Sequence, residues 1–156
     1  ASGRVSAALL ARLMQDPYLS RRPPKTTGRE HYGAAFTNGI FAAAAELKLS
    51  GADILATVTD FTAQTIAAAI RDFCPVRPAR LIVGGGGSRN ATLLRDIAAA
   101  LPDVRVLRNE DLGFDGDAKE AVAFAVLANE AVFARCNNAP SATGARHAVV
   151  MGKITL

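Results

Sequence analysis

The chain is poor in aromatic residues, histidine and cysteine, and each shortage limits the kinds of core or functional site that the protein can have. Aromatic residues make up 6% of its 156 residues, so the core has to be built from alanine and branched aliphatic side chains, which suits helix-rich packing. His31 and His147 are isolated, so neither a metal site nor a Ser-His-Asp arrangement is predicted. Cys74 and Cys136 lack CxxC spacing, which indicates free thiols in a reducing, cytoplasmic setting rather than a disulfide framework.

Long apolar runs are also missing. The longest, Ala121–Ala128, is far shorter than the roughly 20 residues that span a bilayer, so no membrane partner is expected. The net charge is +4, and the basic residues are scattered along the chain. Their nearest approach to a cluster is Arg21, Arg22, Lys25 and Arg29, which does not resemble a nucleic-acid-binding module. Nucleic acid is therefore not expected as a partner.

Hydrophobic periodicity predicts a helix-rich α/β fold with a small, mainly parallel sheet, in a single domain over residues 1–156. Helices are expected from Ser2, as N-cap, to the Asp16-Pro17 pair, then over residues 31–49, 53–73, 90–101 and 117–135. Strands are expected over residues 80–83, 104–107 and 147–151. A strand–helix–strand order with a short crossover predicts that the first two strands are parallel.

Four consecutive glycines follow the apolar triplet Leu81–Val83 and precede a helix. Neither the Rossmann spacing nor the P-loop pattern is present, but a strand, a turn without β-carbons and a helix N-terminus together expose backbone N–H groups to a ligand. Ligands bind at the carboxyl ends of parallel strands, here Gly84–Asn90 and Leu107–Glu110. The residues expected to contact a nucleotide are Gly84, Gly85, Gly86, Gly87 and Asn90. The alternative is a tight turn without a ligand, with Asn90 as a plain helix N-cap.

The order of motifs along the chain is more specific than the glycines alone. PPKTTGRE spans residues 23–30, GGGGSRN spans 84–90, LGFDGDAKEAVAFAVLANE spans 112–130, and Thr-Gly-Ala spans 143–145. This series resembles the C-terminal half of the anhydro-N-acetylmuramic acid kinase family and the related levoglucosan kinases, over nearly the whole chain. The departures are a fourth glycine and Val126-Leu127, where many members have Trp-Leu.

The resemblance implies a lobe of the actin/hexokinase/chaperone-ATPase superfamily, in which two lobes close over ATP and Mg²⁺. The G-T-S-x-D-G phosphate loop and the D-T-G-P-x-N segment with the aspartate base, which the resembled first lobe carries, do not occur in these residues. We therefore expect the C-terminal lobe of an ATP-dependent 1,6-anhydro-sugar kinase, inactive alone and dependent on a missing N-terminal lobe. An exposed sheet edge would favour a homodimer. A levoglucosan kinase lobe and a non-catalytic nucleotide-binding or dimerisation module stay open as alternatives.

The resemblance also implies site residues outside the glycine turn. It places Glu120 on the sugar side of the cleft, where it would assist the aspartate of the first lobe. The alternative is a capping box with Asp117 as N-cap and Glu120 at the third helical position, and Asp115 as a turn residue.

The PPKTTGRE segment supplies the second set. It would present Lys25, Thr26, Thr27 and Arg29 to the substrate, the alternative being a connector stiffened by its two prolines.

Overall fold

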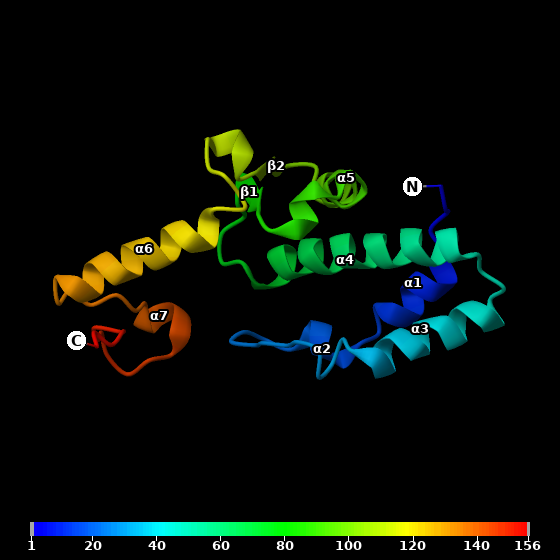
Figure 1. Ribbon diagram of the computed structural model, residues 1–156. Helices are drawn as coiled ribbons and strands as arrows, with labels where there is room; N and C mark the ends of the chain where they lie inside the picture. The colour runs from blue at the N-terminus through cyan, green and yellow to red at the C-terminus, as the bar shows by residue number, and fades with distance from the viewer. Residues whose placement is uncertain (1, 156) are drawn as a thin grey trace. The chain divides into compact units, whose positions relative to one another are not determined.

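The fold is described from a computed structural model that covers residues 2–155. The chain divides into two compact units, Ala1–Arg108 and Asn109–Leu156, and each is described by itself (Figure 1). The first unit contains α1 (Ala7–Leu13), α2 (Pro17–Ser20), α3 (Ala34–Glu46), α4 (Gly51–Phe73), β1 (Arg80–Val83), the 3₁₀ helix η1 (Gly86–Arg89), α5 (Ala91–Ala100) and β2 (Arg105–Arg108). The second contains the 3₁₀ helix η2 (Glu110–Leu112), α6 (Lys119–Val132) and α7 (Pro140–Thr143).

Helix α4 is the central helix of the first unit, and several hydrogen bonds fix the position of its first residue. Ser50 and Asp53 form a capping box, with the Asp53 N–H donating to Ser50 Oγ at 3.2 Å and the Ser50 N–H donating to Asp53 Oδ2 at 3.4 Å. The N–H of Arg4 donates to Asp53 Oδ1 at 2.7 Å, and the N–H of Ser6 donates to the fully buried Thr57 hydroxyl at 2.9 Å. The N-terminal segment is therefore held against the first turns of α4.

The first unit has two apolar clusters, and α4 contributes to both. Its Phe61 packs with Leu9, Leu13 and Ile40 from α1 and α3. Further along α4, Ala63 and Ala67 pack with three residues of the α5 region, Ile97, Leu101 and Val104. The small alanines let α5 lie close to α4, and the sheet residues Leu81 and Val106 pack against the same cluster. The expected core of small and branched aliphatic side chains is confirmed.

The strands β1 and β2 form a parallel pair, as the sequence predicts. Their register pairs Arg80 with Arg105 and Val83 with Arg108, and α5 lies between them in the chain (Figure 1). Both strands therefore end at the same edge of the sheet, where the glycine turn and the residues after β2 begin. The helix-rich α/β class with a small parallel sheet is confirmed.

Several element boundaries differ from the sequence-based expectation at the N-terminal end. The first helix starts at Ala7 with Ser6 as its cap, because the Ser6 Oγ accepts from the Leu9 N–H at 3.3 Å, so the prediction of Ser2 as cap is wrong. The Asp16-Pro17 pair lies beyond the end of α1 and begins the short helix α2, in which Asp16 is the N-cap.

The expected strand over residues 147–151 is not formed. Side-chain amides satisfy its backbone instead of a neighbouring strand. The Asn138 carbonyl oxygen accepts from the Val149 N–H at 2.8 Å, and that of Asn137 accepts from the Met151 N–H at 2.6 Å. The segment is therefore held without becoming part of a sheet. Among residues 2–155, no helix combines the length and the apolar character needed to cross a bilayer.

Candidate functional site

The glycine turn leaves the carboxyl end of β1 in a conformation that only glycine adopts readily. Gly85 has φ +77° and ψ −172°, a region closed to residues with a β-carbon. Its carbonyl oxygen accepts two hydrogen bonds from Ser88, from the N–H at 3.1 Å and from Oγ at 2.7 Å. Ser88 is 5% exposed, so these bonds lie in a protected environment and fix the turn that leads into α5.

The space around this turn is open. A β-carbon built on Gly85 or Gly86 meets no atom within 4 Å, and one on Gly87 meets only the Leu93 side chain at 3.6 Å. All four glycines are exposed. The glycine run is therefore not required for close packing inside the first unit, and its backbone is accessible to a ligand.

Asn90 is the N-cap of α5, because its Oδ1 accepts from the Leu93 N–H at 3.1 Å. This confirms the capping interpretation of Asn90. Its contact with a nucleotide, like that of Gly84–Gly87, stays a prediction.

Asn109 directly follows β2 and lies within the segment Leu107–Glu110 that the sequence places at the ligand-binding edge, although it was not named there as a site residue. Its backbone oxygen accepts from the N–H groups of Leu112 and Phe114 at 3.0 and 3.1 Å. Its Nδ2 is buried and, among the described residues, has no hydrogen-bond partner. The side chain borders a pocket of about 550 Å³ in the second unit, together with Phe114, Asp115 and Lys119. The position itself, first after the carboxyl end of a parallel strand, is the signal that could have singled it out.

Glu120 lies in the first turn of α6, and the predicted capping box around it is wrong. The N-cap position is Ala118, which has no capping side chain. Asp115 accepts from the Asp117 N–H at 2.9 Å, so an Asx turn ends the preceding loop and α6 starts after Asp117. The interpretation of Asp115 as a turn residue is confirmed. Glu120 is exposed and forms no hydrogen bond or ion pair within residues 2–155, so capping does not account for it.

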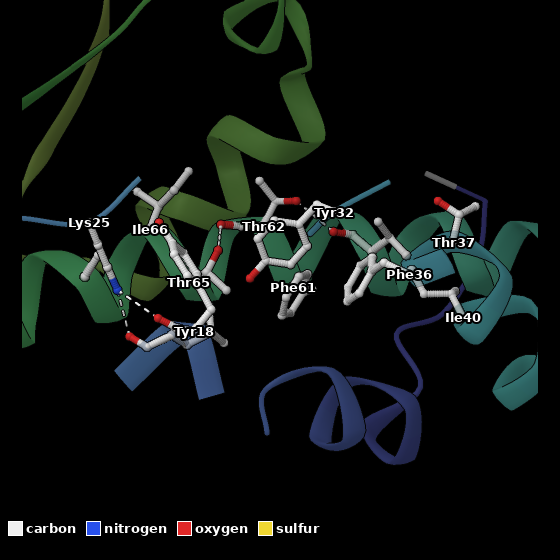
Figure 2. Close-up of a pocket in the computed structure, with 13 residues that line it drawn as sticks. Tyr18, Lys25, Tyr32, Phe36, Thr37, Ile40, Phe61, Thr62, Thr65 and Ile66 are labelled. Atoms are coloured by element: carbon white, nitrogen blue, oxygen red, sulfur yellow. Dashed lines mark hydrogen bonds between the residues drawn. The ribbon is translucent and has the colours of Figure 1, made fainter. Parts of the chain in front are cut away.

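The PPKTTGRE segment forms the loop between α2 and α3, and its lysine points inward. Lys25 Nζ donates to the carbonyl oxygens of Tyr18 and Leu19 at 3.3 and 2.9 Å, as the dashed lines in Figure 2 show. The same ammonium lies 4.9 Å from the centroid of the Tyr18 ring and 4.6 Å from that of Phe73. By contrast, the other three residues expected to bind substrate, Thr26, Thr27 and Arg29, are exposed.

Asp16 is a second residue that sequence reasoning missed. Its Oδ1 accepts from the Tyr18 N–H at 2.9 Å, and its Oδ2 lies 2.7 Å from His31 Nε2. Burial raises the pKa of the Asp16 carboxyl, but hydrogen bonds from His31, the Tyr18 N–H and Tyr32 outweigh burial and hold this pKa below its ordinary value. Burial, with the charge of Asp16 and a hydrogen bond to it, raises the pKa of Tyr32 to about 12.

The signal for Asp16 was present in the sequence. An aspartate followed by proline is typical of a helix start, with the acid as N-cap and the proline at the first helical position.

The structure brings some of the expected site residues together and leaves others on separate elements. Gly84–Gly87 and Asn90 form one continuous turn, while Lys25, Thr26, Thr27 and Arg29 lie on a different loop of the same unit. Glu120 belongs to the second unit. Within residues 2–155, no group of three or more His, Cys, Asp or Glu side chains is arranged to hold a metal ion. Both cysteines are free and exposed.

The first unit is thus an α/β unit with an open, glycine-specified turn at the carboxyl end of a parallel strand. The family follows from comparison with known proteins: the family model for anhydro-N-acetylmuramic acid kinase matches residues 1–156, and the chain belongs to this family.

Curated relatives agree with that assignment. The chain is 46% identical over 156 residues to the anhydro-N-acetylmuramic acid kinase of Caldanaerobacter subterraneus, with 99% of the chain and 39% of the relative covered. It is 45% identical to that of Francisella tularensis subsp. novicida and 41% identical to that of Trichormus variabilis, covering 40% and 39% of those proteins. The chain spans about two fifths of the length of these relatives.

Proposed function

We propose that residues 1–156 form the C-terminal, nucleotide-binding lobe of an ATP-dependent kinase that acts on 1,6-anhydro-N-acetylmuramic acid. Membership of the family supports the reaction class, and the names of the relatives favour this sugar over levoglucosan. The observation that carries nucleotide binding is the open turn at Gly85–Gly87, whose shape depends on glycine while the space beside it is empty. The two exposed free cysteines suit a reducing cytoplasm.

ATP would lie against the turn at Gly84–Gly87, where no side chain keeps the nucleotide from the backbone. We assign the turn to adenine and ribose, by likeness to the adenosine-binding segment of the actin/hexokinase superfamily. The described residues offer no preformed cage for Mg²⁺, which proteins commonly hold through substrate phosphates and one or two carboxylates.

The proposed reaction joins hydrolysis to phosphoryl transfer. Water attacks the anomeric carbon, the bond from this carbon to O6 breaks, and O6 takes the γ-phosphoryl group while ADP leaves. The water's proton passes to a carboxylate base, an aspartate that the other lobe supplies. Glu120 is proposed to assist from this lobe, because it is exposed, negatively charged and without a partner in the described residues. The loop with Thr26, Thr27 and Arg29 is proposed to contact the sugar.

A nucleotide titration of the 156-residue chain, followed by amide chemical shifts, tests the assignment of the turn. Half of a two-lobed cleft desolvates only part of the nucleotide, so we expect weak binding, with a Kd at the millimolar end or about −4 kcal/mol. Shifts should cluster at residues 84–90, and clustering elsewhere would contradict the assignment.

A coupled ADP-release assay with the anhydro sugar tests the reaction. Turnover is expected in the intact two-lobed protein, and background only for the isolated chain, since positioning and charge stabilisation need both lobes. Stoichiometric turnover by the isolated chain would refute the proposed division of the site.

A further inference from the structure

We propose that Asp16 and Lys25 are positioning residues that fix the loop of residues 21–30 from beneath, so that its exposed residues meet the sugar in a preformed arrangement. This inference rests on the proposed function for its link to the sugar, but the positioning itself stands on contacts within the first unit. Neither residue is proposed to touch the substrate.

The loop is tethered at its two ends through one carboxylate. Asp16 caps the start of α2 (Pro17–Ser20), the short helix that leads into the loop, and pairs with His31 just after the loop, across 15 residues of sequence. The Asp16 side chain is 9% exposed, and both of its oxygens are used. The His31 side chain is 43% exposed, so the pair is sheltered on the Asp16 side only. A charge-assisted bond to a largely buried carboxylate is stronger than one between two exposed groups, so this pair closes the loop at its base.

The loop is tethered a third time at its centre. Lys25 lies halfway between the two ends and directs its ammonium at the carbonyl oxygens of Tyr18 and Leu19, in α2 (Figure 2). These are carbonyls near a helix C-terminus, where a cation is favoured. The rings of Tyr18 and Phe73 add cation–π contacts to the Lys25 ammonium. Because Phe73 is the last residue of α4, these contacts join the centre of the loop to that helix.

The return of the loop is held by backbone bonds. The N–H groups of His31 and Tyr32 both donate to the Gly28 carbonyl oxygen, at 3.2 and 2.9 Å. The His31 ring also packs edge-on against the Tyr32 ring, with centroids 4.6 Å apart. The tethers thus surround Thr26, Thr27 and Arg29, whose side chains face solvent. Contacts held by ordered supporting residues cost less conformational entropy when a ligand binds.

Two substitutions in the intact protein test this inference, each with a matched control. Asp16→Asn keeps a side chain able to cap α2 but removes the charge that holds His31, and Lys25→Met keeps the aliphatic stem but removes the ammonium. The controls are Asp103→Asn, at an acid whose side chain is 72% exposed in a surface ion pair with Arg77, and Lys48→Met, at an exposed lysine.

Hydrogen exchange measured by mass spectrometry reports on the loop without any need for activity. We expect exchange of the segment 21–33 to rise roughly tenfold in each test variant, the size expected from losing one charge-assisted bond. Exchange in α4 should stay unchanged, and the controls should match the parent protein. Unchanged exchange in 21–33 for both test variants would overturn the inference, and two variants are used so that a folding defect in one does not decide the matter.

Steady-state kinetics distinguish a failure of the positioning role from a failure of the proposed kinase function. With a disordered loop we expect KM for the anhydro sugar to rise about tenfold while kcat and KM for ATP hold, since the loss is one of uniform binding. Faster exchange with an unchanged sugar KM would overturn the link between loop and sugar, and so the inference. A parent protein without anhydro-sugar kinase activity would refute the proposed function instead, and the exchange data would still decide the positioning role.

Discussion

Replacing Gly85 by alanine tests whether the turn needs glycine for its backbone angles and not for lack of space. Gly85 has φ +77° and ψ −172°, which a residue with a β-carbon adopts at a cost of about 1–3 kcal/mol. No atom lies within 4 Å of the new β-carbon, so steric contact adds nothing to this cost. If the backbone relaxes instead, the Gly85 carbonyl moves away from the two donors of Ser88, one of which belongs to a buried side chain. Either route destabilises the first unit.

Gly86→Ala is the matched control one residue further on. Gly86 has equally open surroundings but no positive φ, and it begins the 3₁₀ helix η1. Replacing glycine by alanine at a compatible position stabilises a protein by about 0.4–1 kcal/mol, mainly by restricting the unfolded chain. The two variants should therefore differ by at least 1 kcal/mol, with Gly85→Ala the less stable.

Urea unfolding followed by far-UV circular dichroism measures this difference, and the absence of tryptophan makes dichroism a better probe than fluorescence. Nucleotide affinity gives a second readout on the same proteins. If ATP approaches the turn closely, Gly86→Ala weakens binding while leaving stability intact. Equal unfolding free energies for the two variants would refute the account of Gly85, and unchanged affinity in a stable Gly86→Ala protein would refute close approach of the nucleotide.

Two further predictions concern Glu120 and Tyr32. In the intact protein, Glu120→Gln should lower kcat by roughly 10²-fold or more if the carboxylate serves in acid–base chemistry, with little change in melting temperature because Glu120 has no capping role; a fully active variant would remove it from the site. The pKa of Tyr32 is raised to about 12, so the neutral phenol stabilises the folded state fully below the ordinary tyrosine value near 10, and this contribution is lost as pH rises through 12. The unfolding free energy of the parent chain should therefore fall more steeply between pH 10 and 12 than that of Tyr32→Phe, and parallel profiles would contradict the proposed environment.

Elements whose signals are local and redundant could be read from the sequence. The long helix α4 was predicted over residues 53–73 and spans Gly51–Phe73, because an acid in the first turn and a continuous apolar stripe both indicate it. The strand over residues 80–83 was predicted with its observed bounds, since a short apolar run ends at a glycine turn. Parallel pairing followed from the short helical crossover between the strands.

Elements whose structure depends on hydrogen bonds between distant residues could not be predicted in this way. Ser2 and Ser6 are equally good N-caps by residue type, and the choice of Ser6 depends on its N–H reaching Thr57, 51 residues away. The segment around Val149 has the composition of a strand, but its backbone is bonded by Asn137 and Asn138, which a pattern of hydrophobicity does not report.

In the candidate site, too, local features could be predicted and contacts between distant segments could not. The glycine turn could be located because four consecutive glycines follow a predicted strand. The residues that support the PPKTTGRE loop could not, because their role depends on contacts between separate segments of the chain. Asp16 and His31 are 15 residues apart, and the partners of Lys25 are carbonyl oxygens, which any residue would provide. The Asp-Pro pair marks Asp16 as a helix cap, but no pattern in the sequence indicates that Asp16 or Lys25 positions this loop.

The glycines of this chain serve different purposes, and the difference bears on function. A β-carbon on Gly33 would overlap the Arg29 carbonyl oxygen, so this glycine is required by packing within the chain. Gly85 is required by its backbone angles. Gly86 meets neither demand, because its φ is not positive and its surroundings are empty. Glycine at such a position costs conformational entropy on folding, and no contact or backbone angle within the chain requires it. A ligand that needs the space beside the backbone would be a reason for glycine there. Close approach of a ligand to the backbone is such a reason, and the proposed nucleotide would make this approach at the edge of the sheet where both parallel strands end.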